Sequence, residues 1–349
     1  MLSFFVIFVA LANPTPLTSQ LKAPEARTQA LQRLITTAEV PKASERGAVD
    51  LALRQILRDT ALDVSTRIYS IRAMGTLASN APILFEHIKH TATSETHRVL
   101  GVESAKALAR FAPPKALVQL LGHTEPEIRS IAARIGGPNE ILCTLASADP
   151  WPVVRESAVY GLSVGAGGVK CISKSLDDSA VKVRLASIKV LSELAAQLSN
   201  LQRAHTITKL KAIVKDSHEV ARLRTSAMST LGALGDCSAA KAALQVYLKS
   251  NRLKVLLFES IGALQQCDEL HPFLGQMLEN KNDQVASLSL RLLVKQNPDL
   301  GCRAVESRSP SFKARRSDLI KHLRADCDAR KPLESRRVGI PDEEMDSED

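Results

Sequence analysis

The chain has 349 residues, of which 45% are hydrophobic and 24% charged, and its formal net charge is +9. This composition is typical of a globular protein with a large core, and it excludes a disordered or collagen-like chain. Only 3% of the residues are aromatic, so Leu, Ala, Ile and Val must fill the core, which favours packed helices over a sandwich or barrel. We therefore expect an all-α fold.

The first twelve residues, MLSFFVIFVALA, contain an apolar run that is too short to span a bilayer. Ala10 and Ala12 supply the small residues that precede a signal-peptide cleavage site, although the usual positive charge at the start is absent. We expect a signal peptide over residues 1–12 and an exported protein, periplasmic or secreted; the alternative is a buried N-terminal helix. No later run is long enough for a membrane span, so none is expected once the signal is removed.

Residues 13–47 are predicted to form a polar leader and an N-terminal capping helix. PEARTQALQRLITTA, residues 24–38, has the apolar spacing of such a helix, and AVDLALRQIL, residues 48–57, follows it at the start of the repeated region.

A similar stretch recurs along residues 48–300 at intervals of 26 to 40 residues. Its anchor position is basic in seven of eight copies: Arg67, Arg98, Arg129, Arg155, Arg184, Arg224, Lys254 and Ala286. The residue three places after the anchor is small in seven copies, and inward positions recur at spacings of four, which places them on one face of a helix. Further apolar segments lie between the copies, such as ILCTLASA at 141–148 and AKAALQVYL at 240–248.

Each repeat is therefore a helix, a turn and a second helix, and one hairpin cannot bury its own apolar face. We expect about eight stacked hairpins, an α-solenoid or α-α superhelix. Acidic residues introduce most second helices, and Asp149 and Asp178 are well placed as N-caps. Trp151, the single tryptophan, is expected to pack over the turn before one second helix. The 40-residue interval between Arg184 and Arg224 predicts a longer helix pair there.

The pattern of Asp149 with Val154-Arg155-x-x-Ala158, and of Asp178 with Val183-Arg184-x-x-Ser187, resembles HEAT-like repeats, especially the short variety found in phycobilin lyases. Lys254 and Ala286 depart from that pattern. The resemblance implies that second helices line a concave surface. It also implies that arginines such as Arg129, Arg155, Arg184 and Arg224 are structural and bridge to an acid of the neighbouring repeat.

Six cysteines are present, and they lack the close pairs that zinc sites use. Cys143 with Cys171 and Cys237 with Cys267 occupy equivalent places in successive repeats, where a helix spacing of about 8–10 Å exceeds the usual disulfide reach. Cys302 and Cys327 fall at a shared end of one hairpin. All three pairs are disulfide candidates in an exported chain, and buried free thiols are the alternative.

Two motifs suggest chemistry, but their context does not support it. Gly161 to Gly165, GLSVG, matches the serine-hydrolase motif, yet no strand precedes it. His87, His90 and His97 could face a metal, but a complete ligand set is not evident. We predict no catalytic, cofactor-binding or metal-binding residues.

Residues 301–331 are expected to form C-terminal capping helices, including SDLIKHLRADC at 317–327. Residues 332–349 are poor in apolar residues and are expected to be disordered. The final eight residues hold six acids and no base, so they could compete with an anionic partner for the basic body, or simply be a solvated end.

HEAT arrays serve as scaffolds, adaptors, lyases and hydroxylases, so the resemblance does not select an activity. We expect a non-catalytic exported scaffold that binds a protein or an anionic partner on its concave face. The alternative is an enzyme, lyase-like or hydroxylase-like, with its site in the groove. Nucleic acid is an unlikely partner because few aromatic residues are available for base stacking.

Overall fold

A computed structural model describes residues 16–36, 41–164, 166–236, 274–275, 277–278, 283–308 and 310–330. These residues are predominantly helical, and no strand occurs among them, which confirms the all-α prediction. The chain divides into two compact units, Met1–Val183 (unit 1) and Arg184–Asp349 (unit 2), and the division falls inside α12 (Val181–Glu193).

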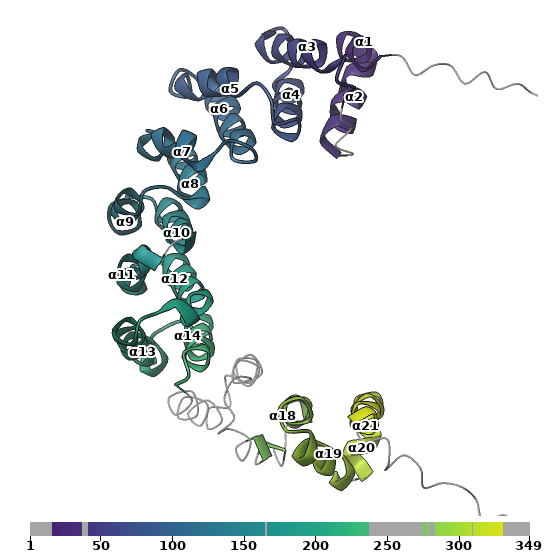
Figure 1. Cartoon of the computed structure of the whole chain (residues 1–349), viewed down its shortest axis with the longest axis vertical. Helices are drawn as coiled ribbons and strands as arrows, with labels where there is room; N and C mark the ends of the chain where they lie inside the picture. The colour runs from purple at the N-terminus through teal and green to yellow at the C-terminus, as the bar shows by residue number, and fades with distance from the viewer. Residues whose placement is uncertain are drawn as a thin grey trace, which may run out of the picture. The chain divides into compact units, whose positions relative to one another are not determined.

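Unit 1 consists of helical hairpins preceded by two short helices (Figure 1). The elements are α1 (Leu17–Lys22), α2 (Pro24–Thr36), α3 (Arg46–Arg58), α4 (Val64–Thr76), α5 (Ala81–Lys89), α6 (Glu95–Leu108), α7 (Pro114–Leu117), η1 (Val118–Gly122), α8 (Pro126–Ile135), α9 (Asn139–Ala148), α10 (Pro152–Gly161), η2 (Leu162–Val164), η3 (Ala166–Gly168), α11 (Val169–Lys174) and η4 (Ser175–Asp177). We number the hairpins 1 (α3–α4), 2 (α5–α6), 3 (α7–α8) and 4 (α9–α10); α11 begins hairpin 5.

The hairpins of unit 1 stack so that like helices meet. α4 contacts α6, α6 contacts α8 and α8 contacts α10, while α9 contacts α11 in the layer of first helices (Figure 1). The predicted anchor residues lie on the second helices, and the small residues three places later, including Gly101, Ala132 and Ala158, are buried between them. Small side chains permit this close approach, so the repeated-hairpin prediction is confirmed for the described hairpins.

Gly161 shows how tightly two neighbouring second helices are packed. A Cβ added to this residue in α10 would stand 2.0 Å from the carbonyl oxygen of Ala133 in α8. Backbone cannot be displaced as easily as a side chain, so only glycine fits at this contact.

Unit 2 contains the same kind of element. Its described helices are the remainder of α12, η5 (Ala195–Gln197), α13 (Asn200–Lys215), α14 (Ala221–Ala233), α18 (Asp283–Gln296), α19 (Pro298–Ser307), α20 (Pro310–Arg315) and α21 (Ser317–Arg330). α13 is the longer helix expected from the wide repeat interval, and a capping box between Ser199 and Gln202 fixes its start. Leu293, Val305 and Leu323 belong to one core that joins α18, α19 and α21.

One local expectation was wrong: Asp149 and Asp178 are not N-caps, since α10 and α12 begin three residues after each of them. The segment expected as a polar leader contains α1, whose Leu17 and Leu21 are buried because the helix packs against α2 and α3. The predicted signal peptide, Lys254, the pair Cys237 and Cys267, and the acidic tail at 332–349 lie outside the described residues.

Candidate functional site

Asp149 and Asp178 each organise the turn that leads into a second helix. A carboxylate oxygen of Asp149 accepts a hydrogen bond from the backbone N–H of Trp151, 2.9 Å away, and Asp178 accepts from Ala180 at 2.7 Å. This local bond, two residues along the chain, fixes an extended turn before the helix instead of capping its first turn. The two aspartates therefore hold identical positions in hairpins 4 and 5.

Each of these aspartates also binds the arginine of the preceding hairpin. Arg129 donates two hydrogen bonds to Asp149, at 2.8 and 3.0 Å, and Arg155 donates two to Asp178, at 2.7 and 2.9 Å. The side chains of the second pair are only 11% and 9% exposed. Paired, two-point contacts of this kind satisfy charges that would be costly to bury alone.

The same arginines bind the backbone of their own hairpins. Nη1 of Arg155 donates to the carbonyls of Asp149 and Pro150, at 2.9 and 3.3 Å, and Arg129 binds the carbonyls of His123 and Thr124 in the same manner. Asp149 therefore accepts hydrogen bonds from Arg129 through its carboxylate and from Arg155 through its backbone carbonyl. We call this chain of contacts, from Arg129 through Asp149 and Arg155 to Asp178, the arginine ladder.

The other predicted repeat positions also lie on second helices and are buried or half-buried. Val154 and Val183 are buried beside the ladder arginines. Arg184 pairs with Glu219 at 2.7 Å, although Asp216 is the acid that introduces the next second helix in the sequence. Arg224 is half-buried on α14.

The anchor arginines of hairpins 1 and 2 do not bind an aspartate as the ladder arginines do. Arg67 is buried and its Nε donates to the carbonyl of Leu57 within hairpin 1. Arg98 is more exposed than the ladder arginines and pairs with Glu95 at 2.8 Å, with Glu125 3.8 Å away. Hairpin 3 has His123 at the position of Asp149 and Asp178, six residues before its anchor, so no aspartate is available there for Arg98.

His123 reproduces the turn contact of the aspartates. Its Nδ1 accepts a hydrogen bond from the N–H of Glu125, 3.0 Å away, and its Nε2 lies 3.2 Å from the carbonyl oxygen of Ile88 at the end of α5. Nε2 also lies 3.5 Å from the hydroxyl of Thr91. Sequence reasoning missed this residue, although comparing the sixth position before each anchor would have found it.

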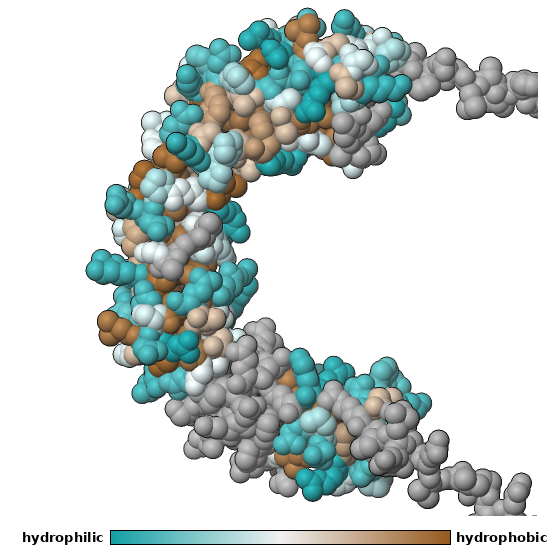
Figure 2. Space-filling view, in the orientation of Figure 1, coloured by the Kyte–Doolittle hydropathy of each residue, from teal (hydrophilic) through white to brown (hydrophobic). Residues whose placement is uncertain are grey.

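The N-terminal end of α10 exposes two large apolar side chains. Trp151 is 54% exposed and Val153 is 46% exposed. The expectation that Trp151 packs over the turn was wrong, because its backbone is extended before α10 and about half of the residue is exposed. Figure 2 shows hydrophobic side chains interspersed with hydrophilic ones over the visible face of unit 1.

Second helices also contact one another along their outward side. Arg72 of α4 pairs with Glu103 of α6 at 3.0 Å, and the guanidinium of Arg134 on α8 lies 4.3 Å from the ring centre of Tyr160 on α10. Arg72, Glu103, Arg134 and Tyr160 all occupy the fifth position after an anchor. Several charges of this layer are therefore already engaged within the protein.

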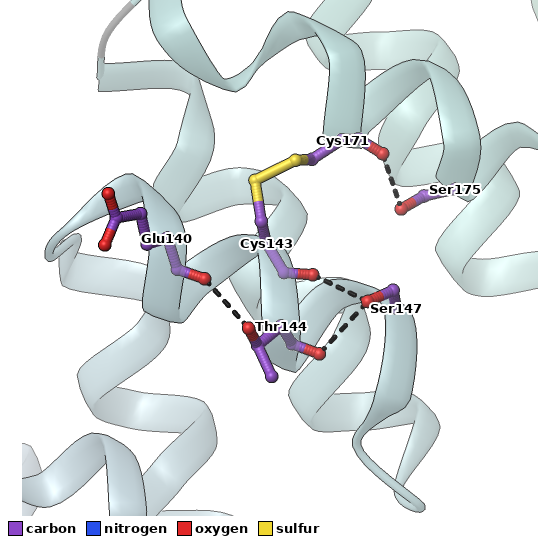
Figure 3. The surroundings of a disulfide bond; sticks show 6 residues. All are labelled: Glu140, Cys143, Thr144, Ser147, Cys171 and Ser175. Atoms are coloured by element: carbon purple, nitrogen blue, oxygen red, sulfur yellow. Dashed lines mark hydrogen bonds between the residues drawn. A yellow bond between two sulfur atoms is a disulfide. The ribbon is translucent and has the colours of Figure 1, made fainter.

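A disulfide joins Cys143 of α9 to Cys171 of α11, with 5.4 Å between their Cα atoms (Figure 3). The expected separation of equivalent helices was too large here. α9 and α11 are in direct contact, which brings the two cysteines within disulfide reach. A second disulfide joins Cys302 of α19 to Cys327 of α21.

The remaining motifs form no assembled site. The hydroxyl of Ser163, in the GLSVG motif, donates to the carbonyl of Tyr160 at 2.6 Å. His97 lies 2.6 Å from the hydroxyl of Ser94, and His87 is half-buried on α5. Among the described residues, no group of three or more His, Cys, Asp and Glu side chains could hold a metal ion. The described helices include none that is both long and apolar enough to cross a membrane.

No known protein family matches the chain, and no curated protein sequence matches it. Solved structures that resemble it include Kap121p, with 14% identity over 89% of this chain and 35% of that chain, at a TM-score of 0.44. An engineered protein is 18% identical over 82% of this chain and 96% of that one, at a TM-score of 0.21. The chain thus spans about a third of the length of Kap121p. The helices and the contacts between them define the fold.

Proposed function

We propose that this protein is a non-catalytic helical-repeat scaffold that binds a partner protein through its layer of second helices. The observation that carries the proposal is the exposure of Trp151 and Val153 on a turn held by a buried ion pair. Aromatic side chains on a preformed surface supply contact area at little conformational cost, which is why they are frequent at binding hot spots.

We further propose that the protein works in an oxidising compartment, as an exported protein would. Two disulfides, Cys143–Cys171 and Cys302–Cys327, support this part of the proposal. Structural disulfides persist outside the reducing cytosol. The basic net charge of +9 would favour an acidic partner surface or another anionic ligand.

A matched pair of variants tests the binding surface. Trp151 on the second-helix layer and Leu51 on α3, a first helix, are both 54% exposed. Proteins captured by the full chain from an extracytoplasmic extract should be lost with Trp151→Ala and retained with Leu51→Ala. Equal capture by the two variants would overturn the proposed surface.

A direct signal complements capture, because Trp151 is the single tryptophan. Adding a purified captured protein should shift its fluorescence to shorter wavelength as the ring leaves water. An unchanged spectrum at saturation would place the partner elsewhere on the molecule.

A further inference from the structure

Three of the eight histidines lie in hairpin 2 or the turn after α5, and His123 of hairpin 3 contacts that same turn. We call the contact between hairpins 2 and 3, made by His123 with Ile88 and Thr91, the 2–3 joint. The corresponding contact between hairpins 4 and 5, made by Arg155 with Asp178 and by the Cys143–Cys171 disulfide, is the 4–5 joint.

We propose that the 2–3 joint is acid-sensitive and is held closed only while His123 is neutral. Nδ1 of His123 accepts the N–H of Glu125, so this nitrogen carries no proton. The proton of the neutral ring is then on Nε2, which donates it to the carbonyl of Ile88. Nδ1 thus fixes the turn of hairpin 3, and Nε2 links that turn to hairpin 2.

Protonation of His123 removes one of these two bonds. A proton on Nδ1 would face the N–H of Glu125, so two hydrogen-bond donors would point at each other. The turn before α8 would then lose the hydrogen bond that stabilises it. The bond from Nε2 to the end of α5 would remain, and a helix C-terminus favours a positive charge. We expect the loss of the half-buried turn bond to outweigh that gain, because the dipole interaction is weakened by solvent.

The charges around the joint are of both signs. Arg129 donates to the backbone carbonyl of His123 at 2.7 Å, and Arg98 lies against Glu125. The other ionisable groups of the elements packed there include Arg67, Glu86, His87, Lys89, His90, Glu95, His97, Glu103, Lys106, Lys115, Glu127 and Arg134. The carboxylates of Glu95, Glu125 and Glu127 are already shared with Arg98, which leaves less of their field to stabilise a histidinium.

His87 is a separate acid-sensitive group in hairpin 2. Burial, and then the positive charges of Arg67 and His97, lower the pKa of His87 to about 4. Exchange in hairpin 3 therefore separates the effect of His123 from that of His87. By contrast, the 4–5 joint is closed by an arginine–aspartate pair and a disulfide, which need no neutral histidine and stay intact in mild acid.

Hydrogen–deuterium exchange of the full chain at pH 7 and pH 5, corrected for the intrinsic exchange rate, tests the proposal. We expect exchange in residues 118–135, which contain the turn that His123 holds, to rise about tenfold at pH 5 as the bond to the N–H of Glu125 is lost. Residues 139–178, which contain the 4–5 joint, should change less than about twofold. Equal changes in the two segments would overturn the proposal.

Two variants assign the effect to His123. His123→Asn keeps an oxygen that accepts from Glu125 but does not titrate, so it should abolish the tenfold rise. His123→Asp recreates the turn of Asp149 and should also abolish the rise. If circular dichroism shows that one of the two variants folds poorly, the other still tests the proposal. His205→Asn, at an exposed position on α13, should retain the full rise. A rise that persists in both His123 variants would refute the assignment.

Discussion

The 2–3 joint and the 4–5 joint solve the same packing problem with different chemistry. In both, a side chain six residues before the anchor accepts the N–H two residues later. Asp178 then receives a charged arginine, whereas His123 bonds a neutral carbonyl. The comparison teaches that one repeat position can close a joint either by a buried ion pair or by an uncharged imidazole, with different responses to mutation and acid.

Removing the arginine of the 4–5 joint should have the largest effect on stability. Arg155→Ala leaves Asp178 buried without its two-point partner and removes two bonds to backbone carbonyls. We expect the free energy of unfolding to fall by about 4 kcal/mol. Urea unfolding followed by the loss of helical circular dichroism measures it.

Arg98→Ala is the control for this prediction. Arg98 lies at the same repeat position but pairs with exposed glutamates, so its loss should change stability little. Similar losses for the two variants would mean that burial of the ladder does not set its strength.

The disulfide of the 4–5 joint should contribute the next largest effect. The double variant Cys143→Ser/Cys171→Ser opens a loop of 28 residues, and chain entropy predicts a loss of about 3 kcal/mol. The same urea titration checks it. Adding reductant to the double variant should cause no further change in the hydrogen exchange of residues 139–178. A further change would show that a second reducible bond also stabilises the 4–5 joint.

Crowding between α8 and α10 should produce a smaller loss. Gly161→Ala places a Cβ against the Ala133 carbonyl, and we expect about 2 kcal/mol of destabilisation. Gly47→Ala, near the start of α3, meets no atom within 4 Å and is the control. Thermal melts should therefore show the larger drop in Tm for Gly161→Ala, and the reverse order would contradict this account.

His87 should make the stability of the protein depend on pH. Its pKa is about 4 in the folded protein, against an ordinary value of 6.5, so the unfolded chain takes up the proton first. The contribution to stability is complete above pH 6.5, declines as the pH falls to about 4, and does not change further below that. His87→Gln should flatten the urea midpoint over this range, while His205→Gln should leave the slope as it is.

The repeat was readable from the sequence because helix packing requires small and apolar residues at fixed spacings. Arg155 and Val154 could be placed on a second helix from that periodicity alone. The exposure of Trp151 could not, because an aromatic residue beside two prolines is compatible with a packed or an open turn. The close approach of Cys143 and Cys171 depended on the packing of α11 against α9, whose distance no spacing rule contains.

Among the described helices, the sequence by itself determined the all-α fold, the phase of the second helices and the positions of their anchor residues, because these follow from local periodicity and side-chain volume. The tertiary structure decided which groups meet across neighbouring hairpins: Arg155 with Asp178, Cys143 with Cys171, and His123 with the end of α5. Such contacts depend on turn geometry and on shifts of an ångström or two between helices, and these distances are set only when the hairpins pack.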